Sequence, residues 1–475
     1  MSGSHLQRRI PLPGLTMNSH TDIPSNHSRR QMLQSVSCGF GYLAFAGMCA
    51  RAAPPDPLSP REPHFRPRAK RVIFLCMGGG PSHLDTFDYK PKLQADAGRD
   101  IEQGNQYQGT GGKLLASQWK FAQHGQSGLW ISELFPNLSK HGDKLCLLNG
   151  MYTDLPSHPH SFVKMHTGNS QFVRPSLGAW SLYGLGTESE NLPGFMVLNP
   201  SSGNGGAQNY GSAFLPATYQ ATAVRGSRGQ ISNISNRRMS REQQRAQLDL
   251  VQSLNQGRLE QNEVDPDVEG VIDSFELAFK MQTEAPRLMD VNRESFSVRR
   301  AYGIGNRATD NFGRQCLLAR RLAESGVRFI ELNYGNWDHH RGLKSGLERN
   351  CQAIDKPIAA LLADLENRDM LKDTLVMWGG EFGRTPHGES TDGRDHNNRG
   401  YTMWMAGGGV KGGMRYGQTD EYGFAAVEDR MHIHDWHATV LHLLGLDHKR
   451  LTFNYSGRDF RLTDVHGEVA TKIIA

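Results

Sequence analysis

Charged side chains and a histidine follow an apolar segment in the C-terminal part of the sequence. The run 374–378 is short and apolar, as in a buried strand. Glu381 and Arg384 come directly after it, and His396 follows a few residues later. Carboxylate and imidazole groups bind divalent metals or take part in acid–base chemistry. The guanidinium of Arg384 could hold a phosphate or sulfate, or form a salt bridge with Glu381 or Asp395.

The same arrangement occurs once more upstream. The run 327–332 is strand-like, and Asp338 and His340 lie just past its end. Open α/β sheets bind ligands at the carboxyl ends of their strands. We therefore expect both sets of side chains to share one site for a divalent metal such as Zn, Mn, Ca or Mg. The alternative is a hydrogen-bonded polar cluster that holds no metal.

Three further histidines lie in one loop-to-helix segment, at His158, His160 and His166. An imidazole titrates near neutral pH and can serve as a metal ligand or as a general base. His158 or His160 could act in either way, whereas most histidines at such positions have only a structural role.

Strands and helices must alternate to position these residues. Strands are predicted at 71–77, 145–148, 327–332, 374–378 and 401–405, and helices at 162–166, 240–259, 271–279, 311–326, 347–367 and 434–444. Such alternation is typical of an α/β fold with a mostly parallel central sheet and helices on both faces. Residues 199–235 are rich in Gly, Ser, Asn and Gln, which predicts a surface excursion, part of an insertion around 199–300.

The N-terminal segment has the features of an export signal. Residues 1–52 contribute +4 of the formal net charge of +5, so the basic balance indicates no nucleic-acid partner. Arg29 and Arg30 precede a weakly apolar run at 36–48, as in a twin-arginine signal. This run is too short for a stable membrane span. We expect export to the periplasm or the cell exterior, with 53–70 as a Pro-rich tether; a disordered basic leader is the alternative.

The cysteines that would remain after removal of this segment are scattered. They are Cys76, Cys146, Cys316 and Cys351. Their spacing contains no Cys-x-x-Cys pair, which predicts buried thiols rather than a zinc site or a dense disulfide framework.

Six motifs occur together in this chain. They are the twin-arginine leader, Gly-Gly-Pro-Ser-His-Leu-Asp-Thr-Phe-Asp at 79–88, Trp-Asp-His-His at 337–340, Glu-Phe-Gly-Arg-Thr-Pro at 381–386, Asp-His-Asn at 395–397 and His-Ala-Thr-Val-Leu-His-Leu-Leu-Gly-Leu-Asp-His at 437–448. In this combination the sequence resembles the domain-of-unknown-function 1501 family, which is placed in the alkaline phosphatase/sulfatase superfamily. The resemblance implies an alkaline phosphatase/sulfatase-like domain over 71–475, with a divalent-metal site at the C-terminal edge of its sheet.

The resemblance also implies roles for individual residues. Asp338 and His340 look like the Asp and His ligands of one metal, and His396 looks like a later His ligand. Glu381 stands where the superfamily usually has Asp-His after a strand. Asp85 could replace the Asp-Asp pair that sulfatases carry at the end of their first strand.

The reactive group of sulfatases has no counterpart in this sequence. His158 occupies the position of their formylglycine-forming cysteine, and there is no Cys-x-Pro-x-Arg motif. Ser157, His158 or an activated water would then be the nucleophile. The implied activity is hydrolysis of phosphate or sulfate esters of a small molecule or polysaccharide. The alternative is a degenerate member that binds an anion, glycan or partner protein without turnover.

Overall fold

The computed structural model describes residues 57–100, 112–189, 191–226, 230–231, 238–260, 266–390 and 392–475. The predicted export signal lies outside the described residues. Residues 57–475 form one compact unit. None of the described helices is both long and apolar enough to cross a membrane.

A ten-stranded sheet forms the centre of this unit, in the order β13-β4-β12-β9-β1-β8-β5-β6-β7, with β16 paired to β4. The strands are β1 (Arg71–Cys76), β4 (Leu145–Tyr152), β5 (Phe195–Leu198), β6 (Thr222–Arg225), β7 (Gln230–Ile231), β8 (Phe329–Asn333), β9 (Thr374–Gly379), β12 (Tyr401–Ala406), β13 (Met414–Tyr416) and β16 (Met431–His432). Strands β9, β1, β8, β5 and β6 are parallel, whereas β12 is antiparallel to both neighbours. The predicted mostly parallel sheet is confirmed.

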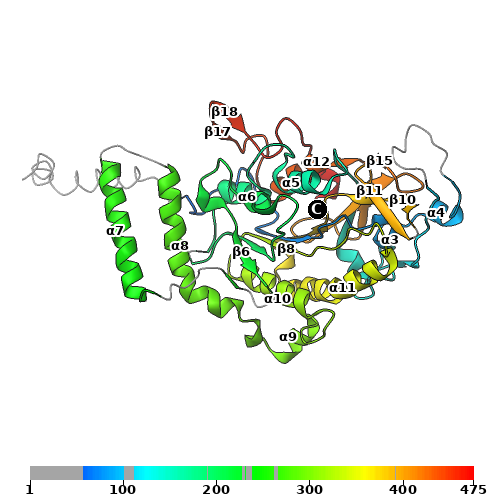
Figure 1. Cartoon of the computed structure of the whole chain (residues 1–475), viewed down its shortest axis with the longest axis horizontal. Helices are drawn as coiled ribbons and strands as arrows, with labels where there is room; N and C mark the ends of the chain where they lie inside the picture. The colour runs from blue at the N-terminus through cyan, green and yellow to red at the C-terminus, as the bar shows by residue number, and fades with distance from the viewer. Residues whose placement is uncertain are drawn as a thin grey trace, which may run out of the picture. The chain divides into compact units, whose positions relative to one another are not determined.

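Helices cover both faces of the sheet, as predicted (Figure 1). One face carries α5 (His158–Thr167), α6 (Leu177–Leu185) and α12 (Ile433–Leu443). The other carries α10 (Asp310–Glu324) and α11 (Leu343–Asn367), which pack against each other.

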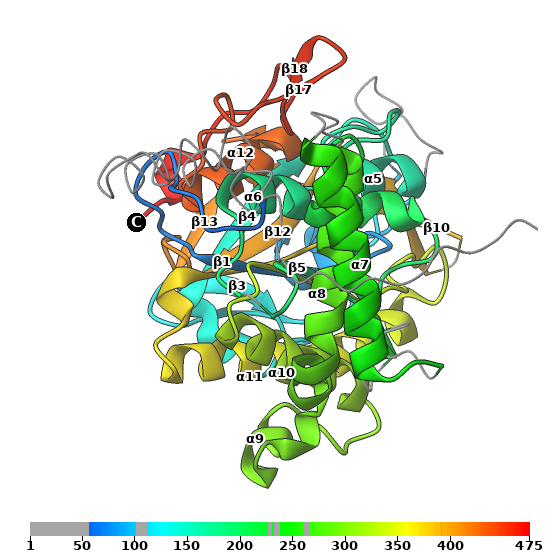
Figure 2. The ribbon, with the colours of Figure 1, turned by 90° about the vertical axis from the view of Figure 1, so that its left-hand side faces the viewer.

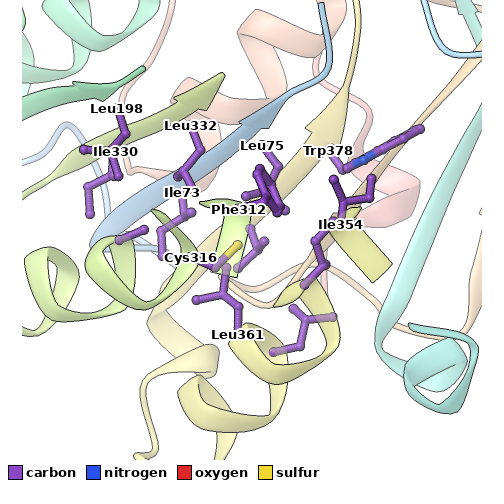
Figure 3. Close-up of a cluster of buried hydrophobic side chains, with 14 of the residues drawn as sticks. Ile73, Leu75, Leu198, Phe312, Cys316, Ile330, Leu332, Ile354, Leu361 and Trp378 are labelled. Atoms are coloured by element: carbon purple, nitrogen blue, oxygen red, sulfur yellow. The ribbon is translucent and has the colours of Figure 1, made fainter. Parts of the chain in front are cut away.

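The alternation of side chains along β1 explains these two layers. Ile73 and Leu75 pack with Cys316 of α10 and Ile354 of α11 (Figure 3). Phe74 points the other way and packs on Trp436 of α12, with ring centroids 5.5 Å apart. Because successive side chains of a strand face opposite sides, a strand that is apolar throughout can be buried by helices on both faces.

Part of the segment 199–235, predicted as a surface excursion, belongs to the sheet, because β6 and β7 extend it. Their sequences, Thr-Ala-Val-Arg and Gln-Ile, are too short and polar to show strand periodicity. The predicted helices that follow are present as α7 (Arg241–Glu260) and α8 (Pro266–Met289), which lie side by side (Figure 2).

The structure also contains shorter α-helices and strands. They are α3 (His83–Thr86), α4 (Pro91–Ala95), α9 (Phe296–Ala301), β2 (Phe121–His124), β3 (Leu129–Ser132), β10 (Gly383–Glu389), β11 (Gly393–Asn397), β14 (Gln418–Thr419), β15 (Ala426–Glu428), β17 (Phe453–Tyr455) and β18 (Arg458–Phe460). The hairpin β10–β11 follows β9 directly and brings its residues back over the sheet edge.

Candidate metal centre

Four side chains from three segments meet beyond the carboxyl ends of the central strands. His158 is the first residue of α5, Asp338 and His340 lie in the loop after β8, and His396 lies on β11. One donor atom of each lies within 4.8 Å of the others. The structure thus brings Asp338, His340 and His396 together, as expected, and adds His158.

The donor atoms lie at or slightly below the spacing found around a metal ion. Asp338 Oδ1 lies 3.1 Å from Nε2 of His158, 2.9 Å from Nε2 of His340 and 3.3 Å from Nε2 of His396. The two Nε2 atoms of His340 and His396 are 2.9 Å apart. Metal–ligand distances of ~2.0–2.2 Å place tetrahedral donors roughly 3.3–3.6 Å apart. The set is therefore compact enough to close on one divalent ion.

Hydrogen bonds on the outer ring nitrogens determine which nitrogen faces the centre. Nδ1 of His158 lies 2.6 Å from Oε1 of Glu381, and Nδ1 of His396 lies 2.9 Å from the carbonyl oxygen of Pro156. An ionised carboxylate and a carbonyl can only accept, so Nδ1 carries the proton in both rings. Their Nε2 atoms are left facing the centre, where each can bind a metal once it carries no proton.

His340 is oriented in the same way, because its Nδ1 donates to the carboxylate of Glu389. Nε2 of His158 is buried and faces Asp338 Oδ1 at 3.1 Å. Metal-binding histidines characteristically bond their second ring nitrogen to a carboxylate or carbonyl. Three such imidazoles around the Asp338 carboxylate therefore fit a divalent ion.

Glu381 supports the centre from behind rather than joining it. Its buried carboxylate accepts hydrogen bonds from the backbone N–H of Gly79, at 3.0 and 3.2 Å, and from His158. Gly79 has φ of 116°, and a Cβ there would lie 2.8 Å from the backbone nitrogens of Trp337 and Asp338. The side chain of an acidic residue therefore does not fit at position 79, just past the end of β1. The carboxylate of Glu381 lies close to this position instead.

Arg384 is not available to clamp a substrate, contrary to one of its two predicted roles. Its guanidinium is 1 % exposed, donates to Asp338 Oδ1 at 2.6 Å and donates to the carbonyl of Gly80 at 2.9 Å. The salt-bridge alternative holds, but the partner is Asp338 rather than Glu381 or Asp395.

Asp85 lies apart from the four-residue centre. Its carboxylate accepts hydrogen bonds from Nε and Nη2 of Arg394, at 2.8 and 3.2 Å, and from Ser82 Oγ at 2.6 Å. The side chains of Asp85 and Arg394 are both fully buried. The expectation that Asp85 acts as a substitute metal ligand is corrected: the residue belongs to a buried ion pair.

Ser157 sits immediately before the centre, at the N-cap of α5. Its Oγ lies 3.0 Å from Nδ1 of His160, whose side chain is exposed. His160 is not part of the centre, so of the two histidines proposed as ligands the structure selects His158. Ser157 keeps a partner that could accept its hydroxyl proton.

Neighbouring charges shift the pKa values of two residues of the centre, His158 and Asp338. Burial lowers the pKa of His158, but the carboxylates of Asp338 and Glu381 outweigh this and raise it to about 9. Burial raises the pKa of Asp338, yet hydrogen bonds from His158, His396 and Arg384 bring it below its ordinary value. A metal would therefore displace a proton from His158, and its binding should weaken as the pH falls below about 9.

We expect Glu389→Gln to lower the affinity for a divalent metal by about 10–100-fold, because the charged acceptor that orients His340 is lost. Titration against a competing chelator measures this change. Glu366→Gln is the matched control, since Glu366 pairs with Lys144 outside the centre. Equal affinities for the parent and Glu389→Gln would show that the carboxylate does not orient a ligand.

A cavity of about 480 Å³ opens beside the centre, and His158 and Asp338 form part of its wall. The remaining lining comes from Phe162 of α5, from the last residue of β8 and from the loops after β1, β5 and β8. Its polar side chains are mainly neutral amides and hydroxyls, at Asn199, Asn204, Asn333, Asn336, Ser201 and Ser202. The described lining contains no lysine or arginine, so positive charge for an anionic ligand would come from a metal or from protonated His158.

Solved structures similar to this chain include a sulfatase, a lipoteichoic acid synthase and an alkaline phosphatase. The first is the PsFucS1 sulfatase from Pseudoalteromonas sp., 12% identical over 80% of this chain and 68% of that chain, with a TM-score of 0.31. The second is the lipoteichoic acid synthase LtaP from Listeria monocytogenes, at 8% identity, 85% and 78% coverage and a TM-score of 0.35. The third is the alkaline phosphatase from the Antarctic bacterium TAB5, at 11% identity, 79% and 98% coverage and a TM-score of 0.31.

No curated protein matches the chain. A family model does match it, over residues 69–474, under the description "Protein of unknown function (DUF1501)". The match covers nearly all of the compact unit.

Proposed function

The chain belongs to the DUF1501 family of proteins of unknown function, and we propose that it is an exported, divalent-metal-dependent hydrolase of phosphate or sulfate esters. One observation supports this most strongly. Three imidazoles, fixed by outward hydrogen bonds, turn Nε2 toward the carboxylate of Asp338 at the wall of a cavity. Such a site is suited to metal-assisted ester hydrolysis.

His158, His340, His396 and Asp338 would hold the ion. A bound divalent ion would neutralise charge on the ester oxygens and make water more acidic. Glu381 keeps the His158 ring in place, with the ring of Phe382 packed against it at a centroid distance of 4.7 Å.

Ser157, which directly precedes His158, is our candidate nucleophile among the described residues. His160 Nδ1 can accept its hydroxyl proton across the 3.0 Å contact. His158 is less suited to this role than expected, because its two ring nitrogens face the carboxylates of Asp338 and Glu381.

The cavity favours a neutral, hydroxyl-rich group next to the ester. Asparagine side chains both donate and accept hydrogen bonds, which matches sugar hydroxyls. A polysaccharide or a small sugar-like molecule that carries a phosphate or sulfate ester fits this lining.

A binding protein without turnover is the second candidate. The position matched to the sulfatase nucleophile carries His158, which is engaged in the centre, and Arg384 is fully occupied by protein partners. A glycan or anion could then be held at the cavity without being cleaved.

One assay distinguishes the hydrolase from the binding protein. Purified mature protein is loaded with Zn²⁺ or Mn²⁺ and tested on an aryl phosphate and an aryl sulfate, before and after chelation. The hydrolase proposal expects turnover that chelation abolishes and added metal restores. Metal-loaded protein that cleaves neither ester would support the binding protein instead.

Export is proposed from the twin-arginine pattern. Arg29→Lys with Arg30→Lys should leave the protein in the cytoplasm, because this pathway reads the arginine pair. Cell fractionation measures the outcome. Arg8→Lys with Arg9→Lys is the matched control, since this pair does not flank the apolar run. Normal export of the Arg29 and Arg30 variant would rule out the twin-arginine route.

A further inference from the structure

A second group of potential ligands lies inside the protein, under the cavity. Cys76 ends β1, Glu331 lies on β8 and His166 lies near the end of α5. Cys76 is in register with Asn333, and Glu331 precedes Asn333 by two residues. Since side chains of a strand alternate between faces, Cys76 and Glu331 point to the same face of the sheet, the one that α5 covers.

The three side chains lie close together and are almost completely buried. Their exposed fractions are 0% for Cys76, 4% for His166 and 2% for Glu331. Nε2 of His166 lies 3.9 Å from Sγ of Cys76 and 3.2 Å from Oε1 of Glu331. All three donor atoms lie within 4.8 Å of one another. Tetrahedral zinc, with bonds of ~2.3 Å to sulfur and ~2.0–2.2 Å to nitrogen and oxygen, spaces such donors roughly 3.4–3.6 Å apart.

The surrounding hydrogen bonds orient the donors toward one point. Nδ1 of His166 lies 2.7 Å from the carbonyl oxygen of Phe162, so Nδ1 carries the proton and Nε2 faces inward. Asn333 donates to Oε1 of Glu331 at 2.8 Å. A nitrogen lone pair and a carboxylate oxygen that face each other at 3.2 Å need a positive charge between them.

We propose that Cys76, His166 and Glu331 form a second site, for a thiophilic divalent cation such as Zn²⁺. A mixed set of thiolate, imidazole and carboxylate is typical of zinc. Binding would release the thiol proton of Cys76 and any proton on Nε2 of His166. The ion would join β1, β8 and α5, since each supplies one ligand. This proposal is independent of the hydrolase activity.

The competing occupant is a proton on Nε2 of His166. Burial lowers the pKa of His166, but the charge of Glu331 outweighs this and raises it. The thiol distinguishes the two occupants. Burial raises the pKa of Cys76 well above its ordinary value, so without a metal it stays a neutral thiol.

The site would also support the floor of the cavity. Phe162, which accepts the hydrogen bond from His166, and Asn333, which donates to Glu331, both line the cavity. A cation at this second site would thus hold two residues of the cavity wall in place through its ligands.

Cobalt substitution tests the proposal on the full chain. Protein loaded with Co²⁺ should show a thiolate-to-cobalt charge-transfer band in the near ultraviolet. Cys76→Ala should lose the band together with about one bound cobalt per chain. Cys351→Ala, which removes another fully buried free thiol, should keep both. His396→Ala should also keep the band, because it changes only the centre at the cavity wall.

Loaded parent protein without this band, or a band that survives in Cys76→Ala, would overturn the proposal and leave the proton as the occupant. If Cys76→Ala does not fold, X-ray absorption of the zinc-loaded parent decides. A sulfur neighbour at ~2.3 Å from zinc is expected, and a shell of nitrogen and oxygen alone would also overturn the proposal.

Discussion

Replacing His158 with alanine should lower the turnover of an aryl phosphate or aryl sulfate by about 10²–10⁴-fold, because it removes a ligand of the ion that would stabilise charge in the transition state. Nε2 of His158 lies 3.1 Å from Asp338 Oδ1, and its other nitrogen is held by Glu381. The variant loses one of four metal ligands and leaves the buried carboxylate of Glu381 without this partner. Measurement of kcat/KM with metal in excess gives the loss.

Controls separate this effect from a general loss of structure. His124→Ala removes an imidazole from β2, outside the centre, and should leave turnover within a few-fold of the parent. Ser157→Ala tests the nucleophile: a loss as large as that of His158→Ala would assign the reaction to the serine. Full activity in His158→Ala would contradict the proposed centre.

Arg394→Met should lower the free energy of unfolding by about 3–5 kcal/mol, the cost of leaving one partner of a buried ion pair alone. Arg394 and Asp85 are both completely buried, and their bond joins β11 to α3. The variant would leave the Asp85 carboxylate charged and inside the protein. Denaturant unfolding of chelated protein measures the change without a contribution from bound metal.

Arg458→Met is the matched control, because Arg458 pairs with Asp464 at the surface and both side chains are about half exposed. Surface pairs contribute about 0–1 kcal/mol. If both substitutions lower the free energy of unfolding equally, the buried Asp85–Arg394 pair is no more costly to break than the surface pair.

The sheet could be predicted from the sequence because its central strands are short apolar runs with polar residues at their ends. The runs at 71–77, 327–332 and 374–378 became β1, β8 and β9, side by side and parallel. This placement brings the residues that follow β8 and β9 to one edge. It explains why Asp338, His340 and His396 could be expected to meet.

The exact ligand set could not be predicted, because it depends on where each side chain turns after its strand. Glu381 follows β9 directly, yet its carboxylate turns inward to the Gly79 N–H. His158 enters the set instead, since α5 begins at this residue, earlier than its apolar pattern indicates. Glu389, which orients His340, stands on a hairpin whose strands carry no apolar periodicity.

The role of Asp85 also could not be predicted from the sequence. Its partner Arg394 lies more than three hundred residues along the chain. Neither residue carries a local signal that it is buried, because charged side chains are mostly exposed unless they are paired.

Metal content is the most direct test of the centre formed by His158, Asp338, His340 and His396. Mature protein with Cys76→Ser, which removes the thiol of the second site, is dialysed against Zn²⁺ or Mn²⁺ and then analysed for bound metal. We expect about one ion per chain at this centre, its loss when His340→Ala and His396→Ala are added, and a lower melting temperature after chelation. Protein that retains no divalent ion, with a melting curve that chelation leaves unchanged, would contradict the account.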